Sequence, residues 1–267
     1  MGPKNEKKMR RLLHIARIFL RNITGRKFEP ETPFLKQLLK PGATCLHIGA
    51  SDGRHSYFMS KIIANGSIFA FEPSSYTFGI FTTLNQLHGL KNIKAFNMAL
   101  SDKAGELELV IPIKTSGRIG HSFSHLVKDS SGETEQGSAI VEKVKIQTMD
   151  EMVQELGISK VDFIRCDTEG SEMGILEGGL GTIARDLPAF LIEIHPVALK
   201  EDFGVDPQKV LDFFFELEYR MFVLKDGKIT ATRELVPGKP WFDYFFIHPS
   251  RSNDLPPGIF KDMMNAK

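Results

Sequence analysis

The sequence predicts a doubly wound α/β fold, in which a mostly parallel sheet ends with an antiparallel strand. Three observations indicate this fold class. Short apolar strands alternate with helix-length patterns, a glycine turn at Gly49 and Gly53 follows the first strand, and the acidic residue Glu72 ends the second strand. The chain has 267 residues and is 42% hydrophobic, which fits one large domain with a small appendage.

The first 27 residues form a basic segment that we expect to hold an amphipathic helix. They carry nine Lys or Arg against one acid, a formal charge of +8, which leaves −7 for residues 28–267. We therefore expect a separate N-terminal helix in residues 1–27 and a catalytic domain in residues 28–267. The acidic balance of the larger part is unfavourable for a nucleic-acid groove.

Apolar residues of this helix are expected on one face, with basic residues on the opposite face. The apolar positions are Leu12, Ile15, Ala16, Phe19 and Ile23. The first interpretation is that this face packs on the body of the protein. Contact of the basic face with an anionic membrane surface, or with nucleic acid, is the alternative. The sequence contains no run of about 18 apolar residues, so no membrane span is predicted.

Turn signals divide the next part of the chain into regular elements. After a proline-flanked break at residues 29–33, we expect helices over 34–39, from 54 onward and over 75–88, and strands over 44–48, 67–71 and 93–100.

The second half adds strands and helices around a polar segment. We expect strands over 106–113, 141–146, 161–166, 189–194 and 242–247, helices over 149–156 and 207–219, a hairpin about residues 226–227, and a polar loop over 115–139 that could cover a substrate.

The glycine turn is typical of a site for a nucleoside-containing cofactor. Gly49 permits a sharp turn off the strand, and Gly53 permits close approach of the backbone to a ligand. Glu72 follows at the end of the second strand, about 20 positions on, where an acid accepts hydrogen bonds from ribose hydroxyls. The alternative is that Glu72 is a solvated strand-end acid.

Two later strands end in titratable residues. Asp167 and Glu169 follow the strand over 161–166, and Glu193 and His195 lie on one face of the strand over 189–194 because side chains alternate. Ligands bind at the carboxyl ends of strands in open α/β sheets. These four residues are therefore candidates for catalysis.

The two cysteines, Cys45 and Cys166, fall in buried strands and are expected to be reduced. This pattern favours a cytoplasmic protein, with the option of a peripheral position on the inner membrane face. His121 and His125 have helical spacing, but no cysteine or acid pattern completes a metal site there. We therefore expect no metal.

Five segments in order carry a resemblance to a known family. LHIGASDGRHS, FAFEP, NMALSD, VDFIRCDTEGSEMGILEGG and LIEIHP, within residues 43–248, resemble the FkbM-type methyltransferases. The resemblance implies a class I (Rossmann-like) methyltransferase fold and S-adenosylmethionine as cofactor. It also implies methyl transfer to a hydroxyl of a sugar or another small natural product.

The resemblance assigns cofactor contacts to the glycine loop, to the end of the second strand and to the turn beside the base. The expected residues are His47, Gly49, Ala50, Ser51, Asp52, Gly53, Ser56, Glu72, Pro73, Ser101, Asp102 and Asp167. Two positions depart from the family pattern. His47 stands where an acid is usual, and Arg165 stands where Lys is more common, so this position cannot accept a proton.

For methyl transfer to a hydroxyl, His195 is the expected proton acceptor because histidine titrates near neutral pH. Asp167 and Glu169 would place acceptor and donor, and Glu193 lies beside His195. A histidine bonded to backbone is the alternative for His195. Two other functions remain: a catalytically decayed binding protein, suggested by His47, and a nicotinamide-dependent oxidoreductase, disfavoured because the spacing G-x-G-x-x-G is missing.

Overall fold

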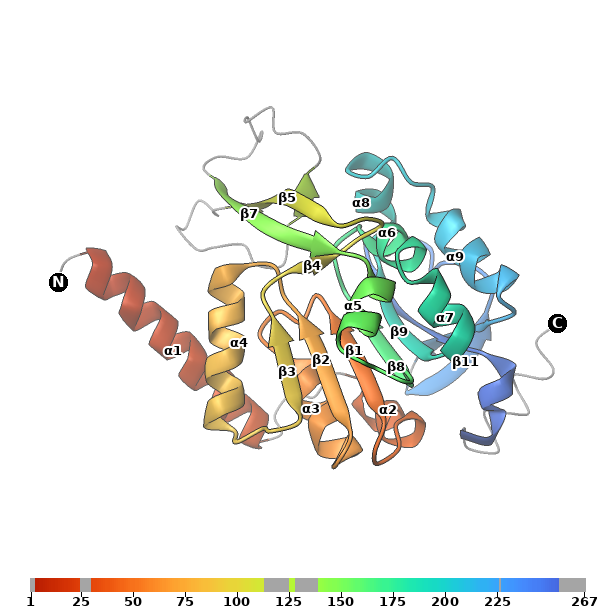
Figure 1. Cartoon of the computed structure of the whole chain (residues 1–267), viewed down its shortest axis with the longest axis horizontal. Helices are drawn as coiled ribbons and strands as arrows, with labels where there is room; N and C mark the ends of the chain where they lie inside the picture. The colour runs from red at the N-terminus through yellow and green to blue at the C-terminus, as the bar shows by residue number, and fades with distance from the viewer. Residues whose placement is uncertain (1–2, 25–29, 113–124, 128–138, 226, 255–267) are drawn as a thin grey trace.

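The computed structural model describes residues 3–24, 30–112, 125–127, 139–225 and 227–254, which form two β-sheets flanked by helices (Figure 1). The larger sheet has eight strands in the order β11-β10-β12-β9-β8-β1-β2-β3. Their bounds are β1 Thr44–Ile48, β2 Ser67–Phe71, β3 Ile93–Phe96, β8 Phe163–Cys166, β9 Ala189–Ile194, β10 Arg220–Lys225, β11 Lys228–Thr232 and β12 Phe242–Ile247.

The centre of this sheet is parallel, and the last strand reverses direction. β3, β2, β1, β8 and β9 pair in parallel, whereas β12 is antiparallel to both β9 and β10. The predicted doubly wound, mostly parallel sheet with an antiparallel last strand is therefore confirmed. Cys45 and Cys166 lie on the neighbouring strands β1 and β8, and both are buried.

Helices cover both faces of the larger sheet, because its central strands are apolar on both sides. One face packs against α2 (Thr32–Leu38), α3 (Arg54–Ile63) and α4 (Ser75–Leu87). The other face packs against α5 (Met149–Glu155), α6 (Glu172–Glu177), α7 (Leu180–Asp186) and α9 (Pro207–Glu216). The short helix α8 (Pro196–Glu201) follows β9 directly. The carboxyl ends of the parallel strands thus meet at one edge, between the two helical layers.

A second sheet lies beyond this edge, above β1–β3 in Figure 1. Its order is β4-β7-β5-β6, with β4 Ala99–Leu100, β5 Gly105–Pro112, β6 His125–Val127 and β7 Ala139–Gln147. The expectation of one strand over 93–100 is wrong, because the chain leaves the larger sheet after Phe96. The Asn97 side chain donates to the carbonyl oxygens of Glu72 and Pro73, and this turns the chain toward the second sheet.

The expected polar loop over 115–139 lies largely outside the described residues. The short strand β6 and residue 139 are its described parts. His121 is outside them, and the side chain of His125 is not described, so the histidine pair has no structural test.

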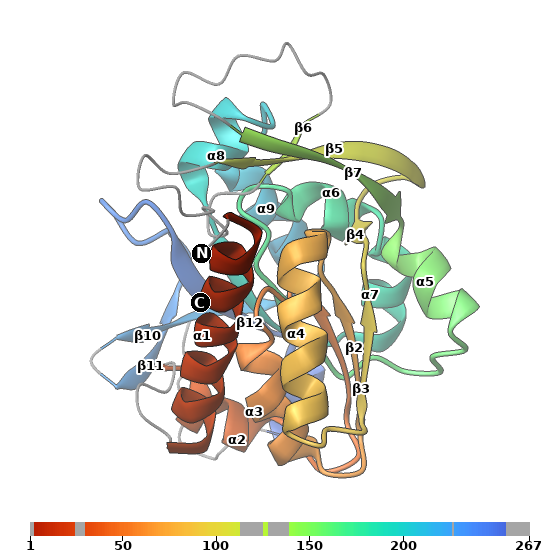
Figure 2. The same cartoon turned by 90° about the vertical axis from the view of Figure 1, so that its left-hand side faces the viewer.

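Helix α1 (Pro3–Thr24) lies along α4 on the outside of the molecule (Figure 2). The expected buried face is wrong in part. Ile15 and Ile18 pack on α4, but Leu12 and Ile23 are 52% and 53% exposed. The cause is that α4 contacts the stripe of Ile15 and Ile18, so Leu12 and Ile23 fall on the outer side of the helix.

The expected division after residue 27 falls within residues 25–29, which the structure does not describe, and stays a prediction. Among the described helices, none combines the length and the apolar character needed to cross a membrane.

Candidate active site

The loop between β1 and α3 is held against two neighbouring segments. The N–H groups of Gly49 and Ala50 donate to the carbonyl oxygen of Phe71 at the end of β2, at 3.0 and 2.9 Å. Gly49 has a φ of +74°, and a Cβ there would overlap the carbonyl oxygen of Asp167. Glycine is therefore needed at this position because the loops that follow β1 and β8 touch.

Gly53 is the N-cap of α3 and also has a left-handed backbone, with a φ of +81°. A Cβ there would overlap the ring of Phe81 on α4. The close approach that this glycine permits in the structure is therefore an approach to α4, whereas the sequence suggested an approach to a ligand.

Glu72 ties this loop to the end of β2. Its Oε2 accepts a hydrogen bond from the N–H of Ser51 at 2.8 Å, and its Oε1 accepts one from the N–H of Ser74 at 2.9 Å. Burial raises the pKa of Glu72 to about 7, although these two hydrogen bonds act in the opposite direction. Each carboxylate oxygen keeps a second lone pair, so the side chain can still accept from a ligand.

Asp52 links the same loop to α1. Its Oδ1 accepts from the N–H of Arg54 at 3.1 Å, and its Oδ2 lies 3.4 Å from Nη2 of Arg21. The N-terminal helix therefore contacts a residue that we expect to bind the cofactor.

His47 and Ser56 are paired with each other beneath the loop. Nδ1 of His47 lies 2.6 Å from Oγ of Ser56, and both residues are buried. Burial lowers the pKa of His47 to about 3, and the charge of Arg165 adds to this effect. His47 is therefore neutral, and its expected contact with the cofactor, like that of Ser56, stays a prediction.

The remaining expected cofactor residues lie at two places. The carbonyl oxygen of Pro73 accepts from Asn97 at 2.8 Å, beside Glu72. Ser101 and Asp102 follow β4 and lie against α6, where a Cβ on Gly178 would overlap the carbonyl oxygen of Ser101. The role of Ser101 and Asp102 beside the base of the cofactor stays a prediction.

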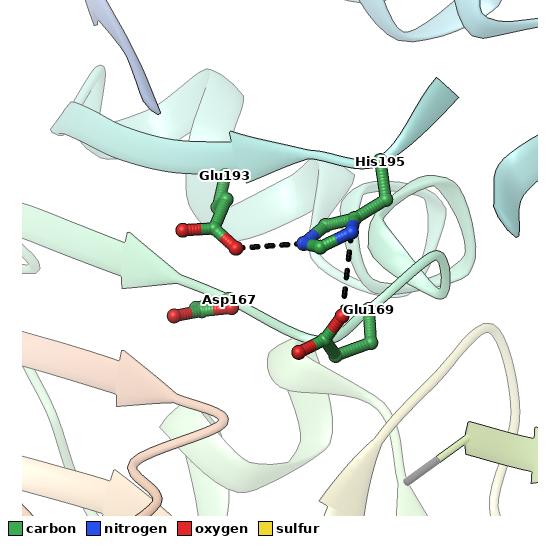
Figure 3. A group of neighbouring side chains, drawn as sticks. All are labelled: Asp167, Glu169, Glu193 and His195. Carbon is green, nitrogen blue, oxygen red and sulfur yellow. Dashed lines mark hydrogen bonds and ion pairs between the residues drawn. The ribbon is translucent and has the colours of Figure 1, made fainter. Parts of the chain in front are cut away.

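The four catalytic candidates converge at the ends of β8 and β9 (Figure 3). One ligand atom from each of Asp167, Glu169, Glu193 and His195 lies within 4.8 Å of the others. Nε2 of His195 is 2.6 Å from Oε1 of Glu193, and its Nδ1 is 3.3 Å from Oε2 of Glu169. The strand pattern placed Glu193 and His195 on one face, and the structure adds that both ring nitrogens face carboxylates.

Burial and neighbouring charges raise the pKa values of both His195 and Glu169. Burial alone would lower the pKa of His195, but its hydrogen bond with Glu193 and the nearby carboxylate charges raise it above 6.5. Burial raises the pKa of Glu169 to about 7, although His195 opposes this rise. The protonation of Glu169 therefore changes near neutral pH, and that of His195 at a higher pH than in an ordinary histidine; groups with such perturbed pKa values are candidates for acid–base catalysis.

Arg165 supplies a buried positive charge behind the cluster. It is 1% exposed, and its Nη2 lies 3.0 Å from Asp167 and 3.7 Å from Glu193. Its Nη1 lies 2.6 Å from Asp243 on β12. Burial would lower the pKa of Arg165, but the charges of Asp243 and Asp167 outweigh this effect and raise it. The guanidinium thus fixes the acids of three neighbouring strands.

The same four residues have donor types that a divalent cation can use. Arg165, and His195 in its protonated form, already bring positive charge to these carboxylates. The expectation of a metal-free site therefore stays a prediction, which chelation can test.

Sequence reasoning missed several residues of the site. Glu172 is fully buried and accepts from the N–H of Gly170 at 2.9 Å, and its place in the D-x-E-G-x-E segment was the available signal. Trp241 is 51% exposed, and its ring lies 6.4 Å from that of His195. Its only signal was that it is the one tryptophan of the chain, directly before the last strand.

A further buried acid, Glu31 of the α2 N-terminus, reaches Asp243. Burial and a hydrogen bond with Asp243 raise the pKa of Glu31 to about 8. No sequence pattern pointed to this contact, because more than 200 residues separate the partners.

Comparison with known proteins places these features in a family. The Methyltransferase FkbM domain family matches residues 47–221, which include the glycine loop, Glu72 and all four catalytic candidates. Methyltransferase sdnD of Sordaria araneosa is 24% identical over 149 residues, covering 49% of this chain and 58% of its own length. Hexuronic acid methyltransferase AglP of Haloferax volcanii is 24% identical over 179 residues, covering 67% of this chain and 64% of its own length.

This chain thus spans less than two thirds of the length of these curated relatives. A crystal structure of methyltransferase FkbM from Methylobacillus flagellatus is similar with a TM-score of 0.48 and 12% identity, over 78% of this chain and 44% of that protein. The family match covers well over half of the chain. The chain therefore belongs to the FkbM methyltransferase domain family, whose cofactor is S-adenosylmethionine.

Proposed function

We propose that this methyltransferase transfers the methyl group of S-adenosylmethionine to a hydroxyl oxygen of a small molecule, such as a sugar. The observation that carries the proposal is the arrangement of Glu193, His195 and Glu169. Glu193 holds His195 at Nε2 through a short contact. Nδ1 of His195 has only a longer contact with Glu169, which an acceptor hydroxyl can replace more easily.

The residues around the glycine loop fit the cofactor by their chemistry. S-adenosylmethionine carries a ribose diol and an amino group, which are hydrogen-bond donors, and Glu72, Asp52 and Asp167 offer carboxylate acceptors around the loop. When bound, this cofactor supplies a methyl group made electrophilic by its sulfonium. The chain then has to orient the acceptor hydroxyl and remove its proton.

Glu193 fixes the tautomer of His195 that can remove this proton. With Nε2–H donated to Glu193 at 2.6 Å, Nδ1 carries the free lone pair. Oε2 of Glu169 lies 3.3 Å from Nδ1, a contact that needs a proton on one of these two atoms. Glu169 also has a left-handed φ of +56°, a strained conformation for a non-glycine residue. An acceptor hydroxyl that replaces Glu169 at Nδ1 gives its proton to His195, while Asp167 and Glu169 position the acceptor and the donor.

Trp241 forms one wall of the proposed acceptor site. Its half-exposed indole is nearly parallel to the ring of His195, at an interplanar angle of 28°. Such an exposed aromatic face can bind the apolar face of a sugar ring. The name of the relative AglP, a hexuronic acid methyltransferase, supports a sugar acceptor.

We also propose that the protein acts in the cytoplasm. Both cysteines are free and buried, which supports a reducing compartment.

Methyl transfer from labelled S-adenosylmethionine to a panel of sugars, uronic acids and other alcohols tests the proposed reaction. We expect an alkali-stable methyl ether. His195→Ala should lower kcat by at least about tenfold, because a positioned base contributes about 10²–10⁴-fold. Its binding of S-adenosylhomocysteine should not change. His248→Ala is the matched control, because this histidine lies at the far end of β12 and bonds Ser250.

Four outcomes would contradict parts of the proposal. An alkali-labile ester would identify a carboxylate acceptor, and normal turnover of His195→Ala with loss in Glu169→Gln would make Glu169 the base. Cofactor binding without transfer to any acceptor would support the decayed binding protein. A chelator should leave turnover unchanged, and loss that Mg²⁺ restores would mean that the cluster holds a metal.

The pH dependence of turnover follows from the raised pKa of His195. The neutral ring is the base, so kcat should rise with pH and reach half its maximum above the ordinary histidine value of 6.5. Trp241→Ala should raise the KM for a sugar acceptor more than it lowers kcat, whereas Trp241→Phe should restore part of the affinity. An unchanged KM in Trp241→Ala would remove this residue from the acceptor site.

A further inference from the structure

Helix α1 has two apolar faces, and its contacts account for one of them. The inner face packs Ile15 and Ile18 against Ile80 and Leu84 of α4. The opposite face carries large apolar side chains that are 45–63% exposed. We call these residues the outer stripe: Met9, Leu12, Leu13, Leu20 and Ile23.

The outer stripe is continuous along the helix. Its members are three, four, eleven and fourteen positions from Met9, and exposed Ala16 fills the gap in the middle. At 3.6 residues per turn, all these positions fall on the side opposite Ile18. Five of the eleven exposed large hydrophobic residues among those with a described burial belong to this one helix. An apolar surface of this kind marks a contact with another partner.

The charge around the outer stripe selects the chemistry of that partner. Residues 1–27 carry a formal charge of +8, and Arg17 is exposed at the edge of the stripe between Leu13 and Leu20. A second copy of α1 placed on the stripe would bring the same positive charge and be repelled. An anionic lipid surface supplies both apolar depth and negative charge.

We propose that α1 docks on an anionic membrane surface through the outer stripe, with Arg17 at the edge of the stripe facing lipid headgroups and the charge of residues 1–27 adding long-range attraction. The helix would lie in the plane of the interface, because its inner face stays on α4. This differs from contact through the basic face alone, since apolar residues enter the lipid. The inference goes beyond the proposed methyl transfer and does not depend on it.

Sedimentation of the full chain with lipid vesicles tests the proposal. We expect binding to phosphatidylcholine vesicles that contain phosphatidylserine, weaker binding at high salt, and little binding to phosphatidylcholine alone. The double variant Leu13→Ser/Leu20→Ser should bind at least about tenfold more weakly, because two leucines no longer enter the lipid. Arg17→Gln should bind about fivefold more weakly.

Leu180→Ser is the matched control, because Leu180 is 48% exposed on α7. It should bind vesicles as the unchanged protein does. Circular dichroism and S-adenosylhomocysteine binding should show that all variants are folded. The proposal is overturned if the unchanged protein does not sediment at low salt, or if the double variant binds as well as Leu180→Ser. It is also overturned if light scattering finds a dimer that the double variant loses, since a second copy then covers the stripe.

Discussion

At the residue scale, Glu72 shows how one side chain can serve both the fold and the site. Its two oxygens hold the N–H groups of Ser51 and Ser74, so the same carboxylate shapes the loop that we expect to surround the cofactor. Glu72→Gln keeps the shape but leaves one N–H facing an amide NH₂. The NH₂ group also cannot accept from a ribose hydroxyl, and an unpaired buried donor on the ligand costs about 1–3 kcal/mol, so calorimetry should find S-adenosylhomocysteine binding about 5- to 150-fold weaker.

The raised pKa of Glu72, about 7, gives this prediction a second readout. The ionised form is the better acceptor for ribose hydroxyls, so binding by the unchanged protein should strengthen as pH rises through 7. Glu72→Gln should lose this dependence, and Glu106→Gln, on an exposed acid of β5, should keep it. Equal affinity and equal pH dependence in Glu72→Gln would remove Glu72 from the site.

The sequence predicted those catalytic candidates that lie at the ends of strands. Asp167, Glu169, Glu193 and His195 follow buried strands that the apolar runs marked, and parallel strands bring such ends together. The contacts of Glu31 with Asp243 and of Trp241 with His195 were not predictable. They join segments that are distant in sequence and that carry no motif.

At the scale of the elements, the loops after β1 and β8 act as one unit because Gly49 lets them touch. Gly49→Ala would combine a left-handed backbone with an overlap on the Asp167 carbonyl oxygen. Gly157→Ala is the control, since Gly157 also has a positive φ, +63°, but no atom within 4 Å of a new Cβ. The left-handed backbone should cost both variants about 1–2 kcal/mol.

The overlap should cost Gly49→Ala about 1–3 kcal/mol more, because backbone has to shift. Urea unfolding of both variants, compared with the unchanged protein, measures the difference. The expected order is a clearly lower midpoint for Gly49→Ala. If both variants have the same midpoint, the two loops do not touch in solution.

Local sequence signals predicted the boundaries of most strands, but they did not always predict which sheet or helix an element packs against. β1, β2, β9 and β12 match their expected residues because each is a short apolar run that ends at a turn, a proline or a polar residue. The run over 93–100 looked continuous, but it is divided between two sheets at Asn97, whose side chain donates hydrogen bonds to the residues that follow the neighbouring strand β2. The exposed face of α1 was misjudged for a similar reason, since α4 decides which stripe is covered.

At the scale of the whole molecule, buried acids make stability depend on pH. Burial raises the pKa of Glu31 from 4.5 to about 8, and the pKa values of Glu72, Glu169 and Glu172 to about 7. These acids bind a proton more tightly in the folded protein than in the unfolded chain. Their contribution is therefore complete below pH 4.5 and is lost as pH rises through their folded pKa values of about 7 and 8. His47 acts oppositely, since its lowered pKa of about 3 removes stability only as pH falls below 6.5.

The interval from pH 8 to 9 reports mainly on Glu31, because the other three acids, with pKa values of about 7, have largely ionised by pH 8 and His47 no longer titrates. The urea midpoint of the unchanged protein should fall across this interval, and the raised pKa of His195 acts in the same direction. Glu31→Gln keeps a donor for Asp243 and cannot ionise, so its midpoint should fall less steeply. Glu216→Gln, on the exposed side of α9, should keep the original slope. An unchanged slope in Glu31→Gln would mean that Glu31 is already ionised in the folded protein, and Arg165 would then balance Asp243 and Glu31 together.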